Sequence, residues 1–361
     1  MTDLTISLII PVYNAEDDLE HLFETLIFQT KQIDEVIFVD NQSKDNSLKM
    51  LKNFQEHNKD KNIVVITEAK KGPSAVRNTG LSKAKSDILA LTDSDCMLDK
   101  DWCKNILKRF KNDFFYDIIG GVASGTEIFG KKQKFKSYTE EFSYYYWTKN
   151  RQSNAAFPMN NIDDFFSSAP FTVATYNVAM KRNVFEKTNG FNEELLNNED
   201  TDFWMRCCRK GLKSLVGIPE IIVCHRNRKE LSSLYRQYHN YGKGLPFLLK
   251  KYFRNRFLIT FRSQKIFEFP FFTGLIEINP HTILTFLIIT HLLLFPSNWI
   301  IFYPLFLLIA RYYLIHSYIK NFVKPTFKRV LSLVLIMETR QIAWSVAAFK
   351  GMFKHMAICF I

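Results

Sequence analysis

The segment most informative about the fold is Leu89-Ala90-Leu91-Thr92-Asp93-Ser94-Asp95. Its first half is apolar, as in a buried strand, and the strand ends in two acids that stand two residues apart. In an extended chain such residues point to the same face. Asp93 and Asp95 therefore offer the hard oxygen ligands that suit Mg²⁺ or Mn²⁺, particularly beside a phosphate. The alternative is a strand-end turn that Asp and Ser side chains stabilise.

This strand is the fourth in an alternation of apolar strands and amphipathic helices over the first 120 residues. We expect strands at Ser7–Val12, Glu35–Asp40, Asn62–Thr67 and Asp87–Thr92, and helices at Leu19–Gln29, Asn46–Phe54 and Ser74–Lys83. The alternation predicts an α/β fold with a mostly parallel sheet and helices on both faces. In such sheets ligands bind outside the carboxyl ends of the strands, so polar residues there are candidate site residues.

Length and composition bound the class of protein. The chain has 361 residues, of which 47% are hydrophobic and 15% aromatic, and its net charge is +12. This length allows two domains, or one large domain with an attachment. The apolar content excludes a disordered chain. The six cysteines lack a metal-knuckle spacing and the first residues lack a secretory signal, so we expect the N-terminal part to fold in the cytosol with reduced thiols.

The C-terminal part of the chain changes character. Residues 225–265 contain eleven Lys or Arg and a single acid, Glu230, and the 33 residues from Ile278 to Ala310 contain no Asp, Glu, Lys or Arg. One bilayer crossing needs about 20 residues, and a basic flank places the preceding domain on the cytoplasmic side. We expect a first domain over residues 1–225, a basic linker or helical juxtamembrane region over 226–277, and transmembrane or membrane-associated hydrophobic helices over 278–361.

Several arrangements fit the uncharged run. A tight hairpin, or one crossing with a re-entrant segment, agrees with its division by Pro296-Ser297-Asn298. A pair of buried core helices is the alternative to membrane insertion. The tail from Val330 fits either a further span or an interfacial amphipathic helix. The positive charge also suggests a nucleic-acid-binding protein as an alternative. A basic excess beside an uncharged run favours a membrane flank instead, so we expect no nucleic-acid partner.

The other predicted strand ends carry further polar residues. The first strand ends in Pro11-Val12-Tyr13-Asn14 and the second ends in Asp40, which is also a type of residue that often caps a helix. A glycine turn at Gly72 precedes the next helix, and the turn alone is a sufficient structural reason for that glycine. Arg77 lies one turn into this helix, from where it could reach a diphosphate.

Together these residues resemble the inverting family 2 glycosyltransferases, which have the Rossmann-like GT-A fold. Five ordered motifs within residues 5–225 carry the resemblance: Pro11, Tyr13 and Asn14; Val39, Asp40, Asn41, Ser43 and Asp45; Gly72, Ala75, Arg77, Asn78 and Gly80; Asp93 and Asp95; and Phe191-Asn192-Glu193 with Glu199-Asp200-Thr201-Asp202. Asn192 stands where the family usually has Asp, which puts only a structural turn in doubt. The stretch from His225 to Gly244 is similar to membrane-bound glucosyltransferases of succinoglycan-type exopolysaccharide assembly.

The resemblance implies a role for each matching residue. Asp200 and Glu199 would form the catalytic pair, with Asp200 as the general base, and the N-terminus of a helix would keep the Asp200 carboxylate ionised. A divalent metal, Mg²⁺ or Mn²⁺, would be held by Asp95, Asp93 and His225. The nucleotide-sugar donor would contact Pro11, Tyr13, Asn14, Asp40, Gly72, Arg77, Asn78, Asp93 and Ser94.

The implied activity is that of a hexosyltransferase at the cell membrane, with its catalytic domain in the cytoplasm. It would transfer a sugar with inversion from a UDP-sugar to a lipid-linked glycan or polysaccharide acceptor in exopolysaccharide synthesis. The processive synthases' Gln-x-x-Arg-Trp motif is absent, which favours the addition of one sugar at a time. Aromatic residues within Phe129–Pro170 suit the acceptor side, a packed lid or a lipid contact equally well. A metal-dependent nucleotidyltransferase acting on sugar phosphates is the alternative class, and it leaves Glu199-Asp200 unexplained.

Overall fold

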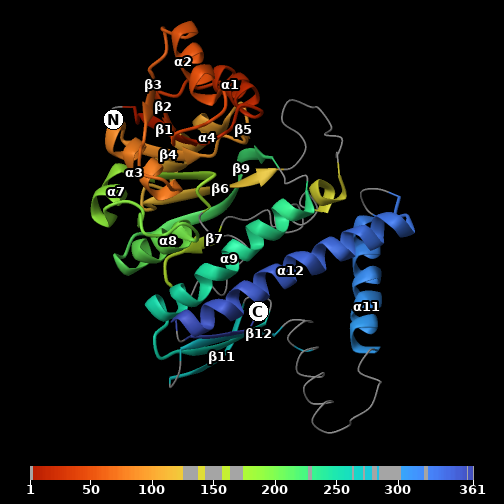
Figure 1. The fold of residues 1–361 in the computed structure, drawn as a ribbon. Coiled ribbons are helices and arrows are strands. Elements are labelled where there is room, and N and C mark those ends of the chain that lie inside the picture. The colour runs from red at the N-terminus through yellow and green to blue at the C-terminus, as the bar shows by residue number, and fades with distance from the viewer. Residues whose placement is uncertain are drawn as a thin grey trace. The chain divides into compact units, whose positions relative to one another are not determined.

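The computed structural model describes residues 3–124, 137–142, 157–162, 174–226, 230–261, 264–270, 273–278, 283, 302–320, 324–355 and 357–360. The chain divides into two compact units (Figure 1). The first unit comprises Met1–Gln133 and Trp147–Arg226, and the second comprises Lys134–Tyr146 and Asn227–Ile361. Every candidate site residue of the sequence analysis belongs to the first unit.

A nine-stranded sheet forms the centre of the first unit. Its parallel half consists of β3 (Ile63–Thr67), β2 (Glu35–Asp40), β1 (Ile6–Val12) and β4 (Ile88–Thr92), side by side in that order. The four strands lie within two residues of their predicted bounds. Their carboxyl ends reach the same edge of the sheet, which is the edge where ligands bind in open α/β sheets.

The other half of the sheet has mixed strand directions. It contains β8 (Asn177–Lys181), β6 (Ile118–Ser124), β9 (Ser214–His225), β5 (Cys96–Leu98) and β7 (Phe157–Met159). β8 runs antiparallel to both β4 and β6, whereas β9 runs parallel to β6 and antiparallel to β5. The predicted mostly parallel sheet is therefore confirmed for the first four strands, and an antiparallel strand separates them from the rest.

Helices cover both faces of the sheet, as predicted. They are α1 (Leu19–Ile27), α2 (Ser47–His57), α3 (Pro73–Lys83), α4 (Trp102–Asn112), α7 (Arg182–Thr188) and α8 (Glu199–Arg209). Leu22 of α1 and Ile106 of α4 share a core with Leu8 of β1. α3 instead packs against Ile9, the next residue of β1, where a Cβ on Gly80 would lie 2.4 Å from the Ile9 Cγ2 atom. Since alternate strand residues point to opposite faces, α3 lies across the sheet from α1 and α4.

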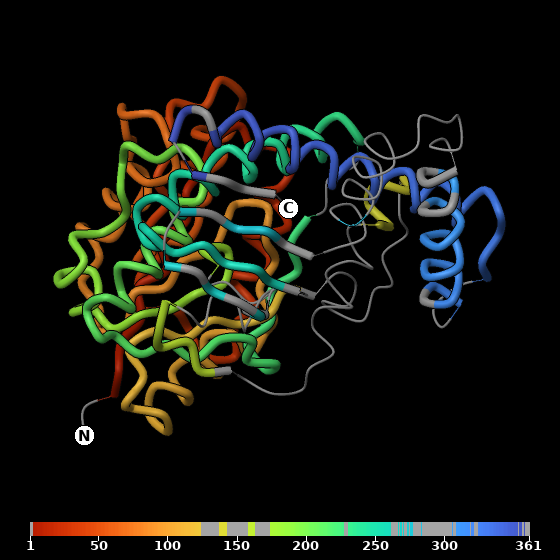
Figure 2. Tube along the Cα trace, turned by 90° about the horizontal axis from the view of Figure 1, so that it is seen from below, coloured from red at the N-terminus to blue at the C-terminus, as the bar shows by residue number. Residues whose placement is uncertain are grey.

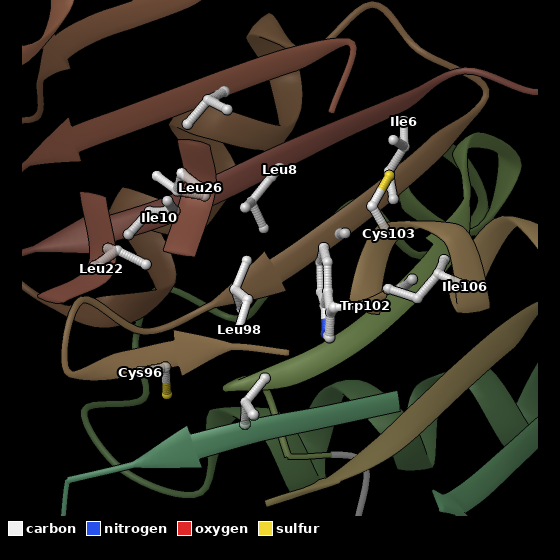
Figure 3. Close-up of a cluster of buried hydrophobic side chains, with 14 of the residues drawn as sticks. Ile6, Leu8, Ile10, Leu22, Leu26, Cys96, Leu98, Trp102, Cys103 and Ile106 are labelled. Carbon is white, nitrogen blue, oxygen red and sulfur yellow. The ribbon is translucent and has the colours of Figure 1, made fainter. Parts of the chain in front are cut away.

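Trp102 of α4 lies in the core on the α1 and α4 face (Figure 3). Trp102 is fully buried, and its indole N–H donates to Asn177 Oδ1 at 2.8 Å. The Asn177 amide group in turn donates to the backbone carbonyls of Val122 and Ile221, at 2.8 and 3.0 Å. These bonds connect α4, β8, β6 and β9, so the mixed half of the sheet is tied to its covering helix.

The second unit contains helices and a separate four-stranded sheet (Figure 2). The helices are α9 (Leu231–Tyr252), α11 (Phe302–Ile319) and α12 (Phe327–His355), and the strands are β10 (Phe257–Phe261), β11 (Gln264–Phe269), β12 (Gly274–Ile278) and β13 (Ile358–Phe360). Residues 226–277 thus contain strands as well as a helix, which differs from the predicted helical region. The reason is the run Phe-Leu-Ile-Thr-Phe of β10, whose β-branched and aromatic residues favour a strand.

Helices α9 and α12 approach closely because small residues line their contact. A Cβ on Gly242 would lie 2.3 Å from the Trp344 carbonyl oxygen, and one on Gly351 would lie 2.9 Å from Pro246. Two ion pairs lie in the same unit: Glu338 lies 3.5 Å from the Arg311 guanidinium, and Arg329 forms an ion pair with Glu141.

Membrane insertion was predicted for the uncharged run, most of which lies outside the described residues. Within the described part of the chain, the helical segment Phe327–Met352 is long and apolar enough to cross a membrane, by length and composition alone. This segment belongs to the tail beyond Val330, for which the sequence allowed either a span or an interfacial helix. The aromatic stretch Phe129–Pro170 also lies largely outside the described residues; its Tyr138 packs against the core of the second unit.

Candidate active site

The loops that follow β1 and β2 are bonded to each other at the carboxyl edge of the sheet. Asn14 has a left-handed backbone, with φ of 49°; its N–H donates to Ser43 Oγ, and its Oδ1 accepts the Lys44 N–H at 2.7 Å. Asn14 therefore positions the loops. Pro11 pairs with the second strand inside the sheet, while the Tyr13 side chain remains 59% exposed and open to a ligand.

Asp40 presents a buried acceptor at the end of β2. The residue is 1% exposed, and its Oδ2 accepts the Ser43 N–H at 3.2 Å. Its Oδ1 is also buried and receives no hydrogen bond from the described residues. A buried acceptor left without a donor costs about 1–3 kcal/mol, and a ligand N–H or O–H would remove that cost.

The loop between β3 and α3 is held by Asn41, a residue that the sequence analysis had only as part of a motif. Its Nδ2 donates to the carbonyls of Glu68 and Lys70, both at 2.9 Å, and its Oδ1 accepts the Gly72 N–H at 3.1 Å. Gly72 has φ of 120°, which favours glycine. Asn41 and Gly72 thus shape the backbone beside Asp40, and the signal for Asn41 was its place directly after the strand-end acid.

Arg77 bridges two acids that lie more than 100 residues apart in the chain. Its Nη1 donates to Glu199 Oε1 at 2.6 Å, and its Nη2 lies 3.3 Å from Asp93 Oδ1. Burial alone would lower the pKa of Arg77, but the charges of Asp93 and Glu199 raise it above the ordinary arginine value. The predicted contact with a diphosphate is therefore not available to these two nitrogens as the structure stands.

Asn78, which was predicted to bind the donor, anchors the segment before α8. Its Nδ2 donates to the Phe191 carbonyl and to Glu193 Oε1, both at 2.9 Å, and its Oδ1 accepts the Phe191 N–H at 2.7 Å. Both amide hydrogens are therefore occupied. In the same segment Asn192 accepts the Glu194 N–H at 3.1 Å, so the turn forms despite the departure from the family pattern.

Asp200 lies in the first turn of α8, directly after Glu199. Its Oδ1 accepts the Thr201 N–H at 2.7 Å. Burial, followed by the negative charge of Glu199, raises the pKa of Asp200 to about 6. Burial and the neighbouring acid therefore oppose the effect expected of the helix N-terminus, which is to keep this carboxylate ionised. A carboxyl group with a pKa this close to neutrality suits a general base.

Asp95 and His225 form a second cluster, created by the antiparallel pairing of β5 with β9. This pairing sets Cys96 opposite His225, and His225 Nε2 lies 3.5 Å from Asp95 Oδ1. Ligand atoms of Asp95, Cys96 and His225 all lie within 4.8 Å of one another. Burial, and then the charge of Asp95, raises the pKa of the Cys96 thiol well above its ordinary value. The predicted ligands of this cluster offer a carboxylate oxygen from Asp95 and an imidazole nitrogen from His225. That donor set fits Mn²⁺.

The structure therefore brings the predicted residues together in two separate contacts. Asp93 and Glu199 meet at Arg77, and Asp95 meets His225. Ser94 lies half-buried in the turn between the two aspartates. Glu199, which was predicted to be catalytic, is held in an ion pair and serves as an anchor.

Comparison with known proteins identifies the class. Residues 7–186 match the model of glycosyl transferase family 2, and the chain belongs to this family. It is a transferase enzyme of that family.

Curated relatives match most of this chain, and one of them, the minor teichoic acid biosynthesis protein GgaA of Bacillus subtilis, is 25% identical over 80% of this chain and 59% of its own length. The glycosyltransferase AglE of Haloferax volcanii is 26% identical over 243 residues, which cover 66% of this chain and 72% of AglE. A Methanococcus voltae enzyme is 22% identical over 71% of this chain and 78% of its own; it is named a dolichyl N-acetyl-alpha-D-glucosaminyl phosphate 3-beta-D-2,3-diacetamido-2,3-dideoxy-beta-D-glucuronosyltransferase. Five other relatives are matched over 15–38% of their own length.

Solved structures confirm the GT-A fold. The mannosyltransferase PcManGT of Pyrobaculum calidifontis, in complex with GDP-Man and Mn²⁺, superposes with a TM-score of 0.59 at 14% identity, over 98% of this chain and 88% of its own. Residues 1–349 of TarS from S. aureus, in complex with UDP-GlcNAc, give a TM-score of 0.50 at 19% identity, over 69% of this chain and 67% of that one. At these identities the likeness concerns the fold alone.

Proposed function

We propose that this chain is an inverting glycosyltransferase that moves a sugar from a nucleotide-sugar donor, in the simplest case a UDP-sugar, to a lipid-linked or polysaccharide acceptor in cell-surface glycan synthesis. The observation that carries the proposal is the double contact of Arg77 with Asp93 and with Glu199, the residue before Asp200. This contact supports a common centre for the strand-end acids and the proposed base. The lipid-linked substrate in the name of the Methanococcus relative and the UDP-GlcNAc of the TarS complex support the substrate class.

The donor nucleotide would bind at the ends of β1 and β2. Asp40 Oδ1 is a buried acceptor that a uracil N–H or a ribose hydroxyl would satisfy. The exposed ring of Tyr13 offers a face for the base, and Pro11 and Asn14 set the position of that ring. The tight backbone at Gly72 would allow the nucleotide to approach the loop after β3.

Asp95 and His225 would hold Mg²⁺ or Mn²⁺, with Asp93 and Ser94 in the same turn beside them. When bound, the ion would act as a Lewis acid that stabilises the charge developing on the leaving diphosphate. The contribution of the chain is to orient these ligands through the β5–β9 pairing and through the bond from the Arg226 N–H to the Asp95 carbonyl, at 3.0 Å.

Asp200 would take the proton of the acceptor hydroxyl as that oxygen attacks the anomeric carbon and the diphosphate leaves from the opposite face. The carboxylate must be ionised for this task, and a pKa of about 6 leaves it mostly ionised at pH 7 while keeping it basic enough to accept a proton. A single displacement inverts the anomeric configuration, and no residue is assigned as a covalent nucleophile.

The remaining parts of the chain would serve attachment. We assign catalysis to residues 1–225, membrane association to residues 278–361, and the connection to residues 226–277. The apolar α12 and the excess of basic residues before it support a place at the cell membrane with the catalytic part in the cytoplasm.

One experiment tests the function directly. The detergent-solubilised full chain with Mn²⁺ is incubated with a panel of nucleotide sugars and candidate lipid-linked acceptors, and release of UDP or GDP is measured. We expect release with one donor, loss of release with EDTA, and an Asp200→Asn variant that binds the donor but does not transfer. Near-normal turnover of that variant would remove Asp200 from its role. If no donor reacts and none raises the melting temperature of the protein, the proposed function is refuted. Formation of a nucleotide sugar from a sugar phosphate would indicate a nucleotidyltransferase.

A further inference from the structure

Helix α3 and the loop before it contact the segment 190–199 at four places. In each case a residue of α3 or of this loop bonds a residue more than 100 positions later in the chain. The pairs are Lys70 with Glu193 at 2.7 Å, Ser74 Oγ with the Leu195 carbonyl at 3.4 Å, Arg77 with Glu199 at 2.6 Å, and Asn78 with Phe191 and Glu193 at 2.7–2.9 Å. Two motifs that are separate in the sequence therefore form one structural element.

Arg77 is the member of this contact whose side chain also reaches a third segment, the turn that carries Asp93. Its planar guanidinium places one nitrogen on Glu199 and another on Asp93, and the group lies 5.7 Å over the Phe191 ring. The side chain is only 6% exposed. A lysine has a single nitrogen at the end of its chain and does not provide this fork.

We propose that Arg77 is a positioning residue of the transfer reaction, whose guanidinium sets the distance between the turn that carries Asp93 and the first turn of α8 that carries Asp200. The inference rests on the proposed function, and it gives Arg77 a role other than contact with the donor diphosphate. Glu199 is then the anchor through which Arg77 acts on Asp200. Correct spacing of the reacting groups matters because a displacement of about 1 Å can cost on the order of 100-fold in rate.

The test uses the full chain in detergent and four variants: Arg77→Gln, Arg77→Lys, Glu199→Gln and the double variant Arg77→Gln/Glu199→Gln. The matched control is Arg109→Gln, which removes another Arg–Glu pair of the first unit, with Glu220, on a helix that carries no candidate site residue. UDP affinity is measured by calorimetry and transfer is measured as kcat and KM for the donor.

A positioning role predicts loss of kcat with retention of UDP affinity. We expect kcat to fall on the order of 10–100-fold in Arg77→Gln and in Glu199→Gln, while the Kd for UDP changes by less than about threefold. The double variant should be no slower than the worse single variant, because both changes break one contact. Arg77→Lys should recover only part of the activity, and Arg109→Gln should match the wild type.

Opposite results would overturn the proposal. A large rise in the Kd for UDP in Arg77→Gln, with unchanged affinity in Glu199→Gln, would make Arg77 a diphosphate ligand. Full activity of Arg77→Lys would show that charge alone, without the fork, is sufficient. Strictly multiplicative losses in the double variant would show that the two residues act separately.

Amide hydrogen exchange provides a readout that does not need activity. In Arg77→Gln and Glu199→Gln we expect faster exchange in peptides that cover residues 93–96 and 198–203, with no change in Arg109→Gln. Unchanged exchange there would refute the positioning role even in an active enzyme. If Arg77→Gln does not fold, Glu199→Gln carries both measurements. If the wild type transfers no sugar, the proposed function fails, while the exchange data still decide whether Arg77 ties the two segments together.

Discussion

Replacing Asp200 with asparagine should stabilise the protein while it stops transfer. Burial and the adjacent Glu199 raise the pKa of Asp200 from its ordinary value of 3.8 to about 6, so the ionised side chain destabilises the folded state at neutral pH. Asparagine carries no charge, and its carbonyl can still accept the Thr201 N–H that Asp200 accepts at 2.7 Å. The substitution removes the cost and keeps the hydrogen bond.

The size of the effect follows from the pKa difference. At about 1.36 kcal/mol per pH unit, the difference between about 6 and 3.8 corresponds to roughly 3 kcal/mol. Because Asp200 is only partly shielded from water, we expect about 1–3 kcal/mol. The cost is fully present above pH 6. It declines as the pH falls from 6 to 3.8, because the folded protein then binds a proton that the unfolded chain does not, and it disappears below 3.8.

Thermal unfolding of the ligand-free wild type and Asp200→Asn at a series of pH values measures this effect. The variant should melt at the higher temperature at pH 7.5, and the two curves should converge near pH 4. Glu24→Gln, an exposed carboxylate on α1, is a control that should show no such pH-dependent gain. A variant that is less stable than the wild type at pH 7.5, or a difference that does not change with pH, would refute the assignment of a raised pKa to Asp200.

Three further predictions concern the reaction, the metal and the sheet. Transfer should fall roughly tenfold per pH unit below about pH 6, as Asp200 becomes protonated, and a flat kcat profile between pH 7 and 5 would contradict this. His225→Ala should raise the Mn²⁺ concentration for half-maximal activity by about tenfold or more, since about 1.4 kcal/mol of lost binding is a factor of ten; an unchanged Mn²⁺ titration would exclude His225 as a ligand. Gly80→Ala should destabilise the fold by about 1–3 kcal/mol in chemical denaturation because its Cβ would overlap Ile9, whereas a neutral effect would show that α3 can move away from β1.

The parallel half of the sheet was predictable because its signals are local. The bounds of β2 coincide with the predicted range. This strand is fully buried, and in the sequence it stands out as an apolar run that ends at an acid. The mixed half was not predictable in the same way. β8 and β6 pair with strands far along the chain, so their direction depends on long-range contacts. β10 was missed because the basic charge of its surroundings was given more weight than its β-branched and aromatic residues.

In the candidate site, too, the sequence predicted the residues better than it predicted their contacts. The family resemblance predicted that Asp93, Asp200 and His225 belong to one site, but sequence motifs carry no information on which residues bond each other. Asn78 looked like a donor ligand, whereas both of its amide hydrogens are used on the segment at Phe191. The raised pKa of Asp200 was not predicted, because the helix N-terminus is visible in the sequence and burial is not.

The first turn of α8 accounts for how one acid can be catalytic among its neighbours. Glu199 is neutralised by Arg77, and Asp202, which is fully buried, is neutralised by Arg206 at 2.9 Å. No ion pair joins Asp200 to a cation among the described residues, although Asp200 lies between the two paired acids. The paired acids hold the helix in place, and the absence of a direct cation contact lets burial raise the pKa of Asp200 toward neutrality. Some carboxylates of this turn thus stabilise the helix, while another is left basic. We therefore expect substitutions of Glu199 and Asp200 to have opposite effects on the melting temperature.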